Sequence, residues 1–217
     1  MRAALESLLR ARKLDVTLTT TAAWSIASPD RLAATGCAEL DIALGGGFRR
    51  GHLSEIIGPA SSGRTTLMMR AIAAATTRGE VTALVDACDT FDPASAAALG
   101  VNLTRMLWVR DSGNADRALK AFSLILQAGG FGLVVFDVAD VAPATVRGFP
   151  WTTWMRTARI IEGGDTVALL VGSDRIARSP GGATIALAAA PPRWTGRTDR
   201  ARLFDGVIPA PRVVNGR

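Results

Sequence analysis

Short apolar runs alternate with segments of helical periodicity along most of the chain. The runs VTALVD, MLWVR, FGLVVFD and TVALLVG end at Asp86, Arg110, Asp137 and Gly172. Runs of this length and composition predict strands that are covered on both faces of a sheet. Between them, apolar residues recur at helical spacing. These segments predict helices at 65–79, 92–100, 114–128 and 151–162.

Two further segments complete the predicted sheet. HLSEIIG at 52–58 and ATIALAA at 183–189 also indicate strands. Strands that alternate with helices predict crossover connections and a mostly parallel sheet, so the fold class is α/β with helices flanking the sheet. In such sheets ligands bind beyond the carboxyl ends of the strands. That edge carries Gly58–Thr65, Asp86 and Asp137.

The two ends of the chain differ from this body. Residues 2–13 predict a helix with leucines on one face, residues 14–18 a strand, and residues 19–35 a linker. We therefore expect an N-terminal appendage at 1–34, a core at 35–195 and a basic tail at 196–217. A solvated terminus is the simpler interpretation of that arginine-rich tail.

The stretch GPASSGRTTL at 58–67 nearly matches the phosphate-binding pattern G-x-x-x-x-G-K-[ST]. Gly58, Gly63 and Thr65 fit the pattern, whereas Arg64 stands at the lysine position. The glycines let backbone N–H groups approach phosphate oxygens, and the helix that follows adds its positive end. Arginine is bulkier and planar, so it weakens the enzymatic interpretation. The alternative is a glycine turn without a ligand.

A magnesium ion is the natural companion of such a loop. The Thr65 hydroxyl can reach Mg²⁺, and Asp137, at the end of FGLVVFD, is placed to hold the same ion through water. ATP and Mg²⁺ are therefore the expected cofactors, either weakly bound or absent.

Composition excludes several other classes of protein. The chain is 48% hydrophobic, and no charge-free apolar run approaches the ~18 residues of a membrane span. Cys37 and Cys88 lie far apart and His52 is the single histidine, so a structural zinc site is not expected. A reduced, cytoplasmic setting is the default expectation. The net charge of +6 and the pI of about 10.8 permit an acidic partner such as nucleic acid without requiring one.

Three stretches together resemble the RecA family of strand-exchange recombinases. They are ATGCAELDIALGGGFRRGHLSEIIGPASSGRTTL, VDACDTFDPASAAALGV and FGLVVFDV, and the similarity runs from about Thr35 to Asp137. The resemblance implies a RecA-like P-loop core, a role in DNA repair and no counterpart of the RecA C-terminal domain. A short RecA-like chain of this kind is similar to the ImuA group, the RecA-related accessory proteins of mutagenic translesion DNA synthesis.

The resemblance also implies a set of nucleotide-binding residues. They are Gly58, Ser61, Ser62, Gly63, Arg64, Thr65, Thr66 and Asp92. Two further positions depart from the RecA pattern. Cys88 stands where RecA has the glutamate that activates water, and Ser95 stands where a tyrosine stacks on adenine. Losing a general base costs about 10²- to 10⁴-fold in rate. Nearby Asp86 and Asp89 would raise the pKa of Cys88, so we interpret it as a passive thiol.

The DNA-binding loops of RecA correspond to the segments after the strands that end at Asp137 and Gly172. Candidate DNA contacts there are Arg147, Arg156, Arg175, Arg178, Gly181 and Gly182. Tryptophans among arginines also suit nucleic acid. However, Trp151, Trp154, Met155 and Ala158 fall on one helical stripe, which favours core packing or a partner-binding face. The second loop, 175–183, is shorter than in RecA, which argues against DNA wrapping.

Two main functions compete at this stage. The first is an adaptor between a RecA-type recombinase and an ImuB-like translesion polymerase subunit, with a degenerate ATP site. The second is an active DNA-dependent ATPase with recombinase-like repair activity. The changes at Arg64, Cys88 and Ser95 favour the adaptor. Residues 2–18 occupy the place of the RecA polymerisation segment, so they either dock on a partner or fold back on their own domain.

Overall fold

The computed structural model describes residues 31–177, 181–189, 192–207 and 210–215. From Arg31 onward these residues belong to one compact unit. The helix and strand expected at 2–18 lie outside the described residues.

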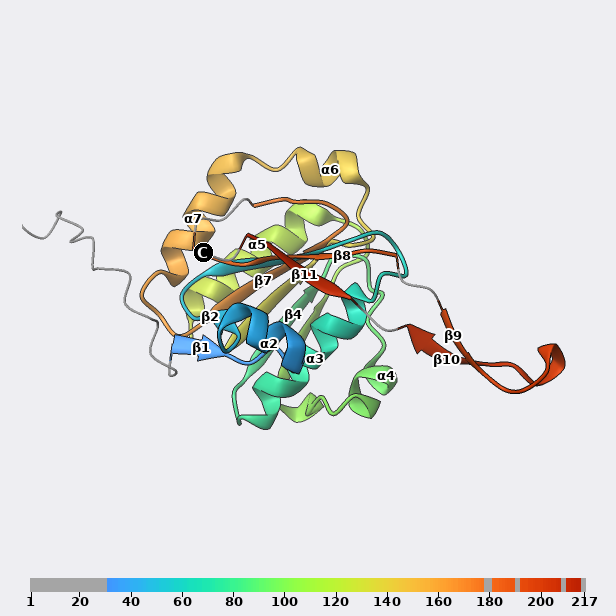
Figure 1. Cartoon of the computed structure of the whole chain (residues 1–217). Coiled ribbons are helices and arrows are strands. Elements are labelled where there is room, and N and C mark those ends of the chain that lie inside the picture. Colours follow the sequence, from blue (N-terminus) through green and yellow to red (C-terminus); the bar gives the residue numbers. More distant parts are fainter. Residues whose placement is uncertain (1–30, 178–180, 190–191, 208–209, 216–217) are drawn as a thin grey trace, which may run out of the picture. The chain divides into compact units, whose positions relative to one another are not determined.

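A seven-stranded sheet organises this unit (Figure 1). Its strand order is β11-β8-β3-β7-β6-β4-β5, and every neighbouring pair is parallel except β11 with β8. The bounds are β3 Leu53–Ile57, β4 Thr82–Asp86, β5 Met106–Arg110, β6 Leu133–Asp137, β7 Val167–Gly172, β8 Thr184–Leu187 and β11 Pro211–Asn215. The predicted α/β class with a mostly parallel sheet is confirmed.

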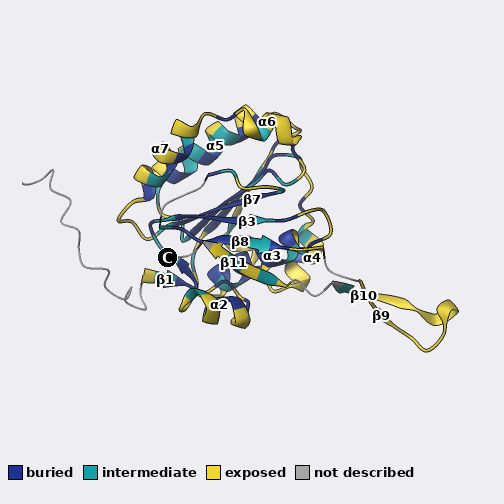
Figure 2. Cartoon of the chain, turned by 45° about the horizontal axis from the view of Figure 1, so that its top comes forward, coloured by how far each residue is buried: buried dark blue, intermediate teal, exposed yellow. Residues whose placement is uncertain are grey.

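Helices cover both faces of the sheet (Figure 2). One face carries α2 (Ala38–Leu44), α3 (Arg64–Thr77) and α4 (Pro93–Ala98). The other carries α5 (Ala115–Ala128), α6 (Pro143–Arg147) and α7 (Trp151–Ile161). A short 3₁₀ turn, Leu103–Arg105, precedes β5.

Alternate residues of each central strand enter two separate hydrophobic cores. Leu84 of β4 packs in the core that contains Ile72 of α3. Its neighbour Val85 packs in the other core, with Phe122 of α5 and Trp154 of α7. Because successive side chains of a strand point to opposite faces, both faces must be apolar when both are covered. This double burial explains the uninterrupted apolar runs in the sequence.

The strand register brings the candidate residues to one edge of the sheet. Asp86 pairs with Asp137 across β4 and β6, and Asp137 pairs with Val171 of β7. The N–H of Gly58 donates to the Gly172 carbonyl at 3.3 Å. The loop after β3 and the two aspartates therefore meet at the carboxyl edge, as the alternation of strands and helices predicts.

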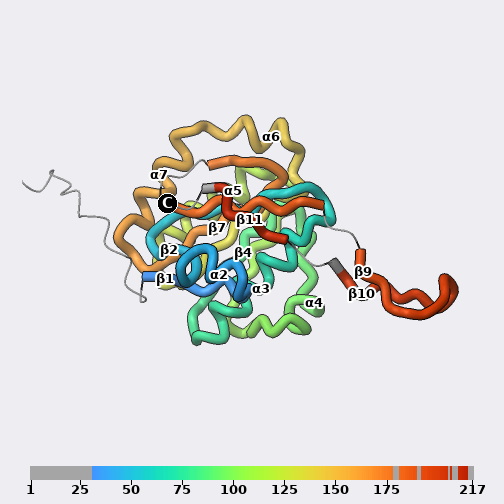
Figure 3. The backbone as a smooth tube through the Cα atoms, viewed as in Figure 1, coloured from blue at the N-terminus to red at the C-terminus, as the bar shows by residue number. Residues whose placement is uncertain are grey.

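Two segments differ from the sequence expectation. Within the segment interpreted as a linker, β1 (Leu32–Ala33) pairs antiparallel with β2 (Phe48–Arg49). Within the expected tail, β10 (Leu203–Val207) follows a 3₁₀ turn at Asp199–Ala201 and pairs antiparallel with β9 (Pro192–Thr195), which lies at the end of the expected core (Figure 3). Also within the expected tail, β11 extends the main sheet beside β8. Both expectations rested on composition, which does not report backbone pairing between short strands.

Candidate nucleotide-binding loop and its surroundings

The loop between β3 and α3 has the backbone geometry that its glycines allow. Gly63, the residue before α3, has φ 91°, and Ser61 has φ 60°. A Cβ on Gly58 would lie 2.6 Å from the Leu187 carbonyl oxygen and 2.7 Å from the Ser62 hydroxyl. Gly58 and Gly63 are therefore required by close approach and by positive φ.

The start of α3 has the features of an anion site. Gly63 provides no side-chain cap, and the first turn of α3 contains no acidic residue. The first N–H groups of a helix lack intrahelical acceptors and carry partial positive charge. Beside them, the buried Ser62 hydroxyl has no hydrogen-bond partner among the residues that the structure describes. The loop backbone and the Ser62 hydroxyl thus fit a phosphate group, and Ser61, Thr65 and Thr66 adjoin them in the sequence.

Arg64 departs from this picture, because its side chain turns into its own loop. The guanidinium Nη1 donates to the Gly58 carbonyl oxygen at 2.6 Å, and Arg64 is only 8% exposed. The cation that would face a phosphate is instead bonded to the first carbonyl of the loop. Binding of a phosphate by this side chain would require breaking a buried, charge-assisted hydrogen bond.

Asp137 is a partly buried carboxylate at the end of β6. Burial raises its pKa from 3.8 to about 6, and the neighbouring carboxylates of Asp86 and Asp140 add to this effect. A hydrogen bond from the Ala139 N–H at 2.9 Å and the charge of Arg64 act in the opposite direction. Asp137 and Thr65 remain the residues that could hold Mg²⁺. In the part of the chain described by the structure, no cluster of three or more His, Cys, Asp or Glu residues could hold a metal ion.

The raised pKa of Asp137 predicts how stability depends on pH. As pH rises from about 4 to 6, the unfolded chain releases this proton while the folded protein keeps it, so stability falls across that window. Asp137→Asn mimics the neutral form and keeps an acceptor for Ala139. We expect the variant to match the wild type at pH 4 and to exceed it by roughly 2 to 3 kcal/mol at pH 7. Urea unfolding of both proteins at both pH values measures this. If the free energies of unfolding of variant and wild type differ by the same amount at pH 4 and pH 7, the prediction is contradicted.

Asp86 supports the loop that follows β4. Its buried carboxylate accepts hydrogen bonds from the backbone of the residues that follow β4. The donors are the N–H groups of Cys88, Thr90 and Phe91, and Trp108 Nε1 adds a bond at 3.4 Å. Several donors on one buried carboxylate compensate its desolvation. Asp86 therefore fixes the backbone that carries Cys88.

Cys88 lies in a strongly acidic environment. Burial raises the pKa of its thiol, and the carboxylates of Asp140, Asp86, Asp137 and Asp111 raise it further. The sequence pointed to Asp86 and Asp89. Asp86 contributes, whereas Asp89 is paired with Arg110 at 2.7 Å. A protonated thiol is neither a good nucleophile nor a base, which agrees with a passive role.

Asp92 and Ser95 are engaged with each other at the start of α4. Asp92 accepts bonds from the N–H groups of Ala94 and Ser95 and from the Ser95 hydroxyl at 2.5 Å. The Ser95 hydroxyl, followed by these N–H groups, lowers the pKa of Asp92. This is a helix N-cap. Ser95 offers no aromatic surface on which a base could stack.

Glu55 is a site residue that sequence reasoning missed. It lies in the middle of β3 and is 1% exposed. Its carboxylate accepts hydrogen bonds from the N–H groups of Ile176 at 2.8 Å and Ala177 at 2.5 Å. Glu55 therefore fixes the segment that follows β7, one of the two candidate DNA loops. The sequence feature that could have indicated Glu55 is its position as a charged residue within the apolar run HLSEIIG.

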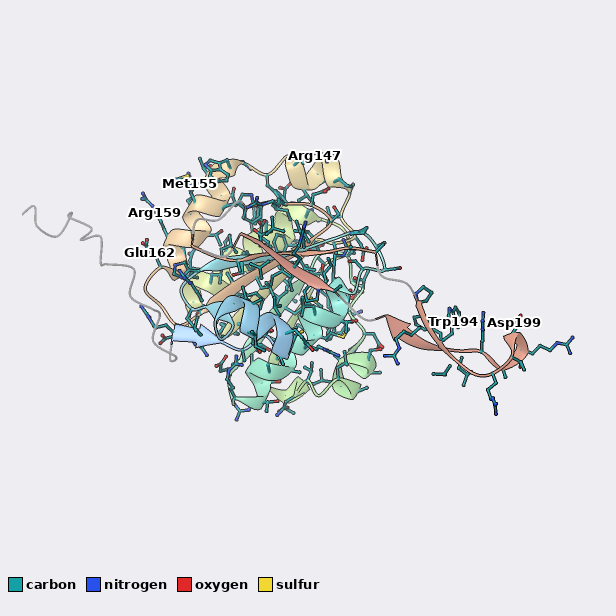
Figure 4. All side chains as sticks on the ribbon, in the orientation of Figure 1. Arg147, Met155, Arg159, Glu162, Trp194 and Asp199 are labelled. Carbon is teal, nitrogen blue, oxygen red and sulfur yellow. The ribbon has the colours of Figure 1, made fainter. Side chains whose placement is uncertain are left out.

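The candidate DNA contacts separate into different surfaces. Arg147 and Arg175 line one cavity of about 240 Å³, together with Asp174. Arg156 lines a groove between α5 and α7 instead. Figure 4 shows Arg147 on α6 and Met155 on α7. Arg178 lies outside the described residues.

The glycines of the second loop have packing roles. A Cβ on Gly181 would lie 2.6 Å from the His52 ring, and one on Gly182 would lie 1.8 Å from the Leu53 carbonyl oxygen. Both glycines thus pack closely against the start of β3, and close packing explains why the chain has glycine at these two positions.

The tryptophan stripe of α7 is divided between core and surface. Trp154 is 3% exposed and belongs to the core with Phe122 and Phe136. Trp151 and Met155 are about half exposed and border a cavity of about 260 Å³ with His52. Of the two roles that the stripe favoured, core packing or a partner-binding face, core packing holds for Trp154. The exposed pair leaves a partner-binding face open.

The RecA N-terminal domain matches residues 24–148, more than half of the chain. The chain belongs to the RecA family. The match covers the glycine loop, both edge aspartates and Cys88, so the RecA-like core expected from the sequence is confirmed. In the described part of the chain, no helix has the length and apolar character that a membrane crossing needs.

The similarity to curated RecA proteins covers half of this chain. Protein RecA of Borrelia hermsii (strain HS1 / DAH) is 42% identical over 111 residues, which cover 50% of this chain and 31% of that protein. Protein RecA of Chlorobaculum parvum is 45% identical over 111 residues, covering 50% and 32%. The chain therefore spans about a third of the length of these relatives. The crystal structure of the RadB recombinase aligns with a TM-score of 0.54 and 20% identity, covering 72% of this chain and 83% of that one. This last likeness concerns the fold alone.

Proposed function

We propose that this RecA-family protein acts as an accessory of the ImuA type in the DNA damage (SOS) response. In this role it is a cytoplasmic adaptor between a RecA-type recombinase and an ImuB-like polymerase subunit during mutagenic translesion synthesis. The observation that carries the proposal is the inward turn of Arg64. Its guanidinium is buried in the glycine loop and bonded to the Gly58 carbonyl, within an otherwise RecA-like core.

The surroundings of the loop support weak or absent ATP turnover. Cys88 stands at the place of the water-activating glutamate, and its environment keeps the thiol protonated. Ser95, at the place of the adenine-stacking tyrosine, bonds to Asp92. If ATP binds, the loop backbone from Gly58 to Thr66 would hold its phosphates, and Thr65 with Asp137 would hold Mg²⁺. The bound ion would neutralise phosphate charge.

The second candidate function is a DNA-dependent ATPase with recombinase-like repair activity. It is favoured by the intact loop backbone, by the Ser62 hydroxyl, which has no hydrogen-bond partner among the described residues, and by the carboxylate of Asp137 at the end of β6, on the same edge of the sheet. Under this alternative, Arg64 leaves the Gly58 carbonyl when nucleotide binds. The two functions differ in turnover and therefore can be separated by experiment.

A capture experiment tests the adaptor role. The immobilised full chain is offered a RecA-type recombinase and an ImuB-like polymerase subunit at about 10 µM, where an interface of about −7 kcal/mol is detectable. We expect capture of both, and weaker capture of at least one after deletion of residues 2–18. Unchanged circular dichroism of that variant is the control for folding. Capture of neither partner by the full chain would contradict the adaptor role.

A further inference from the structure

The loop between β3 and α3 is closed at its base by a side chain. Arg64, the first residue of α3, donates from Nη1 to the Gly58 carbonyl oxygen at 2.6 Å, so this bond joins the two ends of the loop. Residues 59–61 between them are exposed, whereas Gly58, Ser62 and Arg64 are buried. Within the loop, the Ser62 N–H also donates to the Pro59 carbonyl at 3.3 Å. Among the described residues, no other side chain bonds across the loop.

The backbone of this loop needs support to keep its shape. Ser61 has φ 60°, in the left-handed region that residues other than glycine rarely adopt, and Gly63 has φ 91°. Such conformations persist only where the surrounding structure holds them. A phosphate bound to the first N–H groups of α3 and to the Ser62 hydroxyl can supply that support. The bond from Arg64 to Gly58 can supply it as well.

The Arg64 guanidinium also places a positive charge inside the loop. Arg64 is 8% exposed, and a cation buried this far needs acceptors. The Gly58 carbonyl provides one in a charge-assisted hydrogen bond. Burial raises the pKa of Asp137 at the end of β6, and the charge of Arg64 acts against this rise. A phosphate in the loop and the Gly58 carbonyl would therefore compete for the same buried cation.

We infer that Arg64 orders the glycine loop in place of a ligand. Its bond to Gly58, which we call the Arg64 lock, gives the loop its final shape when no nucleotide is bound. A nucleotide then adds little order, because the loop is already closed. The lock itself stands on the geometry of the loop. Its consequence rests on the proposed function: the core presents the same surface to the partners of the adaptor with or without ATP.

Hydrogen exchange of the loop amides in the full chain, measured without nucleotide, tests the lock. Arg64→Met keeps an unbranched side chain and removes the guanidinium. We expect exchange across residues 58–66 to rise about tenfold to hundredfold, the loss that a hydrogen bond to a charged group implies. The matched control is Arg70→Met, which removes an exposed guanidinium from the same helix and should leave this exchange within about twofold.

Inorganic tripolyphosphate with Mg²⁺ probes how the loop depends on a ligand, because it offers the phosphates of ATP without a base. We expect it to restore the protection of residues 58–66 in Arg64→Met. In the wild type it should change their exchange by less than about twofold, since the lock already orders them. Three results would overturn the inference: unchanged exchange in Arg64→Met, no recovery with tripolyphosphate, or an equal gain of protection in both proteins.

A second variant covers the case in which Arg64→Met disturbs the whole core. Arg64→Lys keeps a positive charge and lacks the planar group. Exchange of the loop should rise in this variant, while exchange of β6 stays as in the wild type. A lysine variant whose loop exchanges like the wild type would overturn the lock. The same holds if β6 and the loop exchange faster by the same factor.

Partner capture in parallel separates the lock from the proposed function. The full chain is offered a RecA-type recombinase and an ImuB-like polymerase subunit, with and without ATP and Mg²⁺. We expect equal capture under both conditions. Capture that requires ATP would overturn the consequence of the lock. Capture of neither partner would contradict the adaptor role, whereas the lock is decided by hydrogen exchange alone.

Discussion

Replacing Glu55 with alanine is expected to lower the free energy of unfolding by roughly 2 to 6 kcal/mol. The change removes the acceptor of two backbone N–H groups, that of Ile176, whose hydrogen bond is partly buried, and that of Ala177, whose hydrogen bond is buried. Each buried donor left unpaired costs about 1 to 3 kcal/mol. Both donors lie after β7, so the loss also releases the segment that this carboxylate holds against β3. Urea denaturation followed by circular dichroism measures the change.

Glu55→Gln is the matched control, because its side-chain oxygen can still accept both hydrogen bonds. We expect this variant to lose much less stability than Glu55→Ala. The amide nitrogen would face the Thr184 hydroxyl, which lies 3.4 Å from the second carboxylate oxygen and can serve as an acceptor. If alanine and glutamine at this position are equally stable, Glu55 does not hold the loop.

Arg64→Lys combined with Cys88→Glu is expected to raise ATP turnover by about 10²-fold or more, since a general base contributes roughly 10²- to 10⁴-fold. Lysine is a compact cation without the planar group that bonds the Gly58 carbonyl in the wild type. The carboxylates that raise the pKa of the Cys88 thiol would also raise the pKa of a glutamate there. A carboxylate with a raised pKa is a better base near neutral pH.

Two controls isolate the contributions of this pair. Arg64→Lys alone tests phosphate binding without a base, and Cys88→Gln has the shape of glutamate without its charge. We expect the turnover of both controls to stay well below that of the double variant. In calorimetry, Arg64→Lys and the double variant should both bind ATP more tightly than the wild type. A double variant that binds ATP yet is no faster than the wild type would contradict the assigned role of position 88.

Much of the fold was predictable from sequence pattern. The apolar runs that ended at Asp86 and Asp137 became neighbouring central strands, because buried parallel strands leave a clear periodicity and end at a common edge. The glycine loop was also predictable, since Gly58 and Gly63 are required by local backbone geometry. These features depend on residues close in sequence or on general rules of chain connection.

The remaining features depend on contacts that local sequence does not encode. The inward turn of Arg64 is a choice of side-chain conformation inside a folded loop. Glu55 finds its partners more than 120 residues away. The β9–β10 hairpin was not predicted, because an arginine-rich composition is typical of a solvated terminus. Its strands are short, and their pairing includes a bulge between Phe204 and Gly206, which interrupts the regular alternation.

ATP turnover by the purified wild-type protein, with and without single-stranded DNA, is the most direct test of the central claim. The claim is that a RecA-family core serves here as an adaptor with a degenerate nucleotide site. With Arg64 bonded to the Gly58 carbonyl and a protonated thiol at position 88, we predict turnover at background under both conditions. Robust hydrolysis that rises on addition of single-stranded DNA would contradict the adaptor account and favour the ATPase.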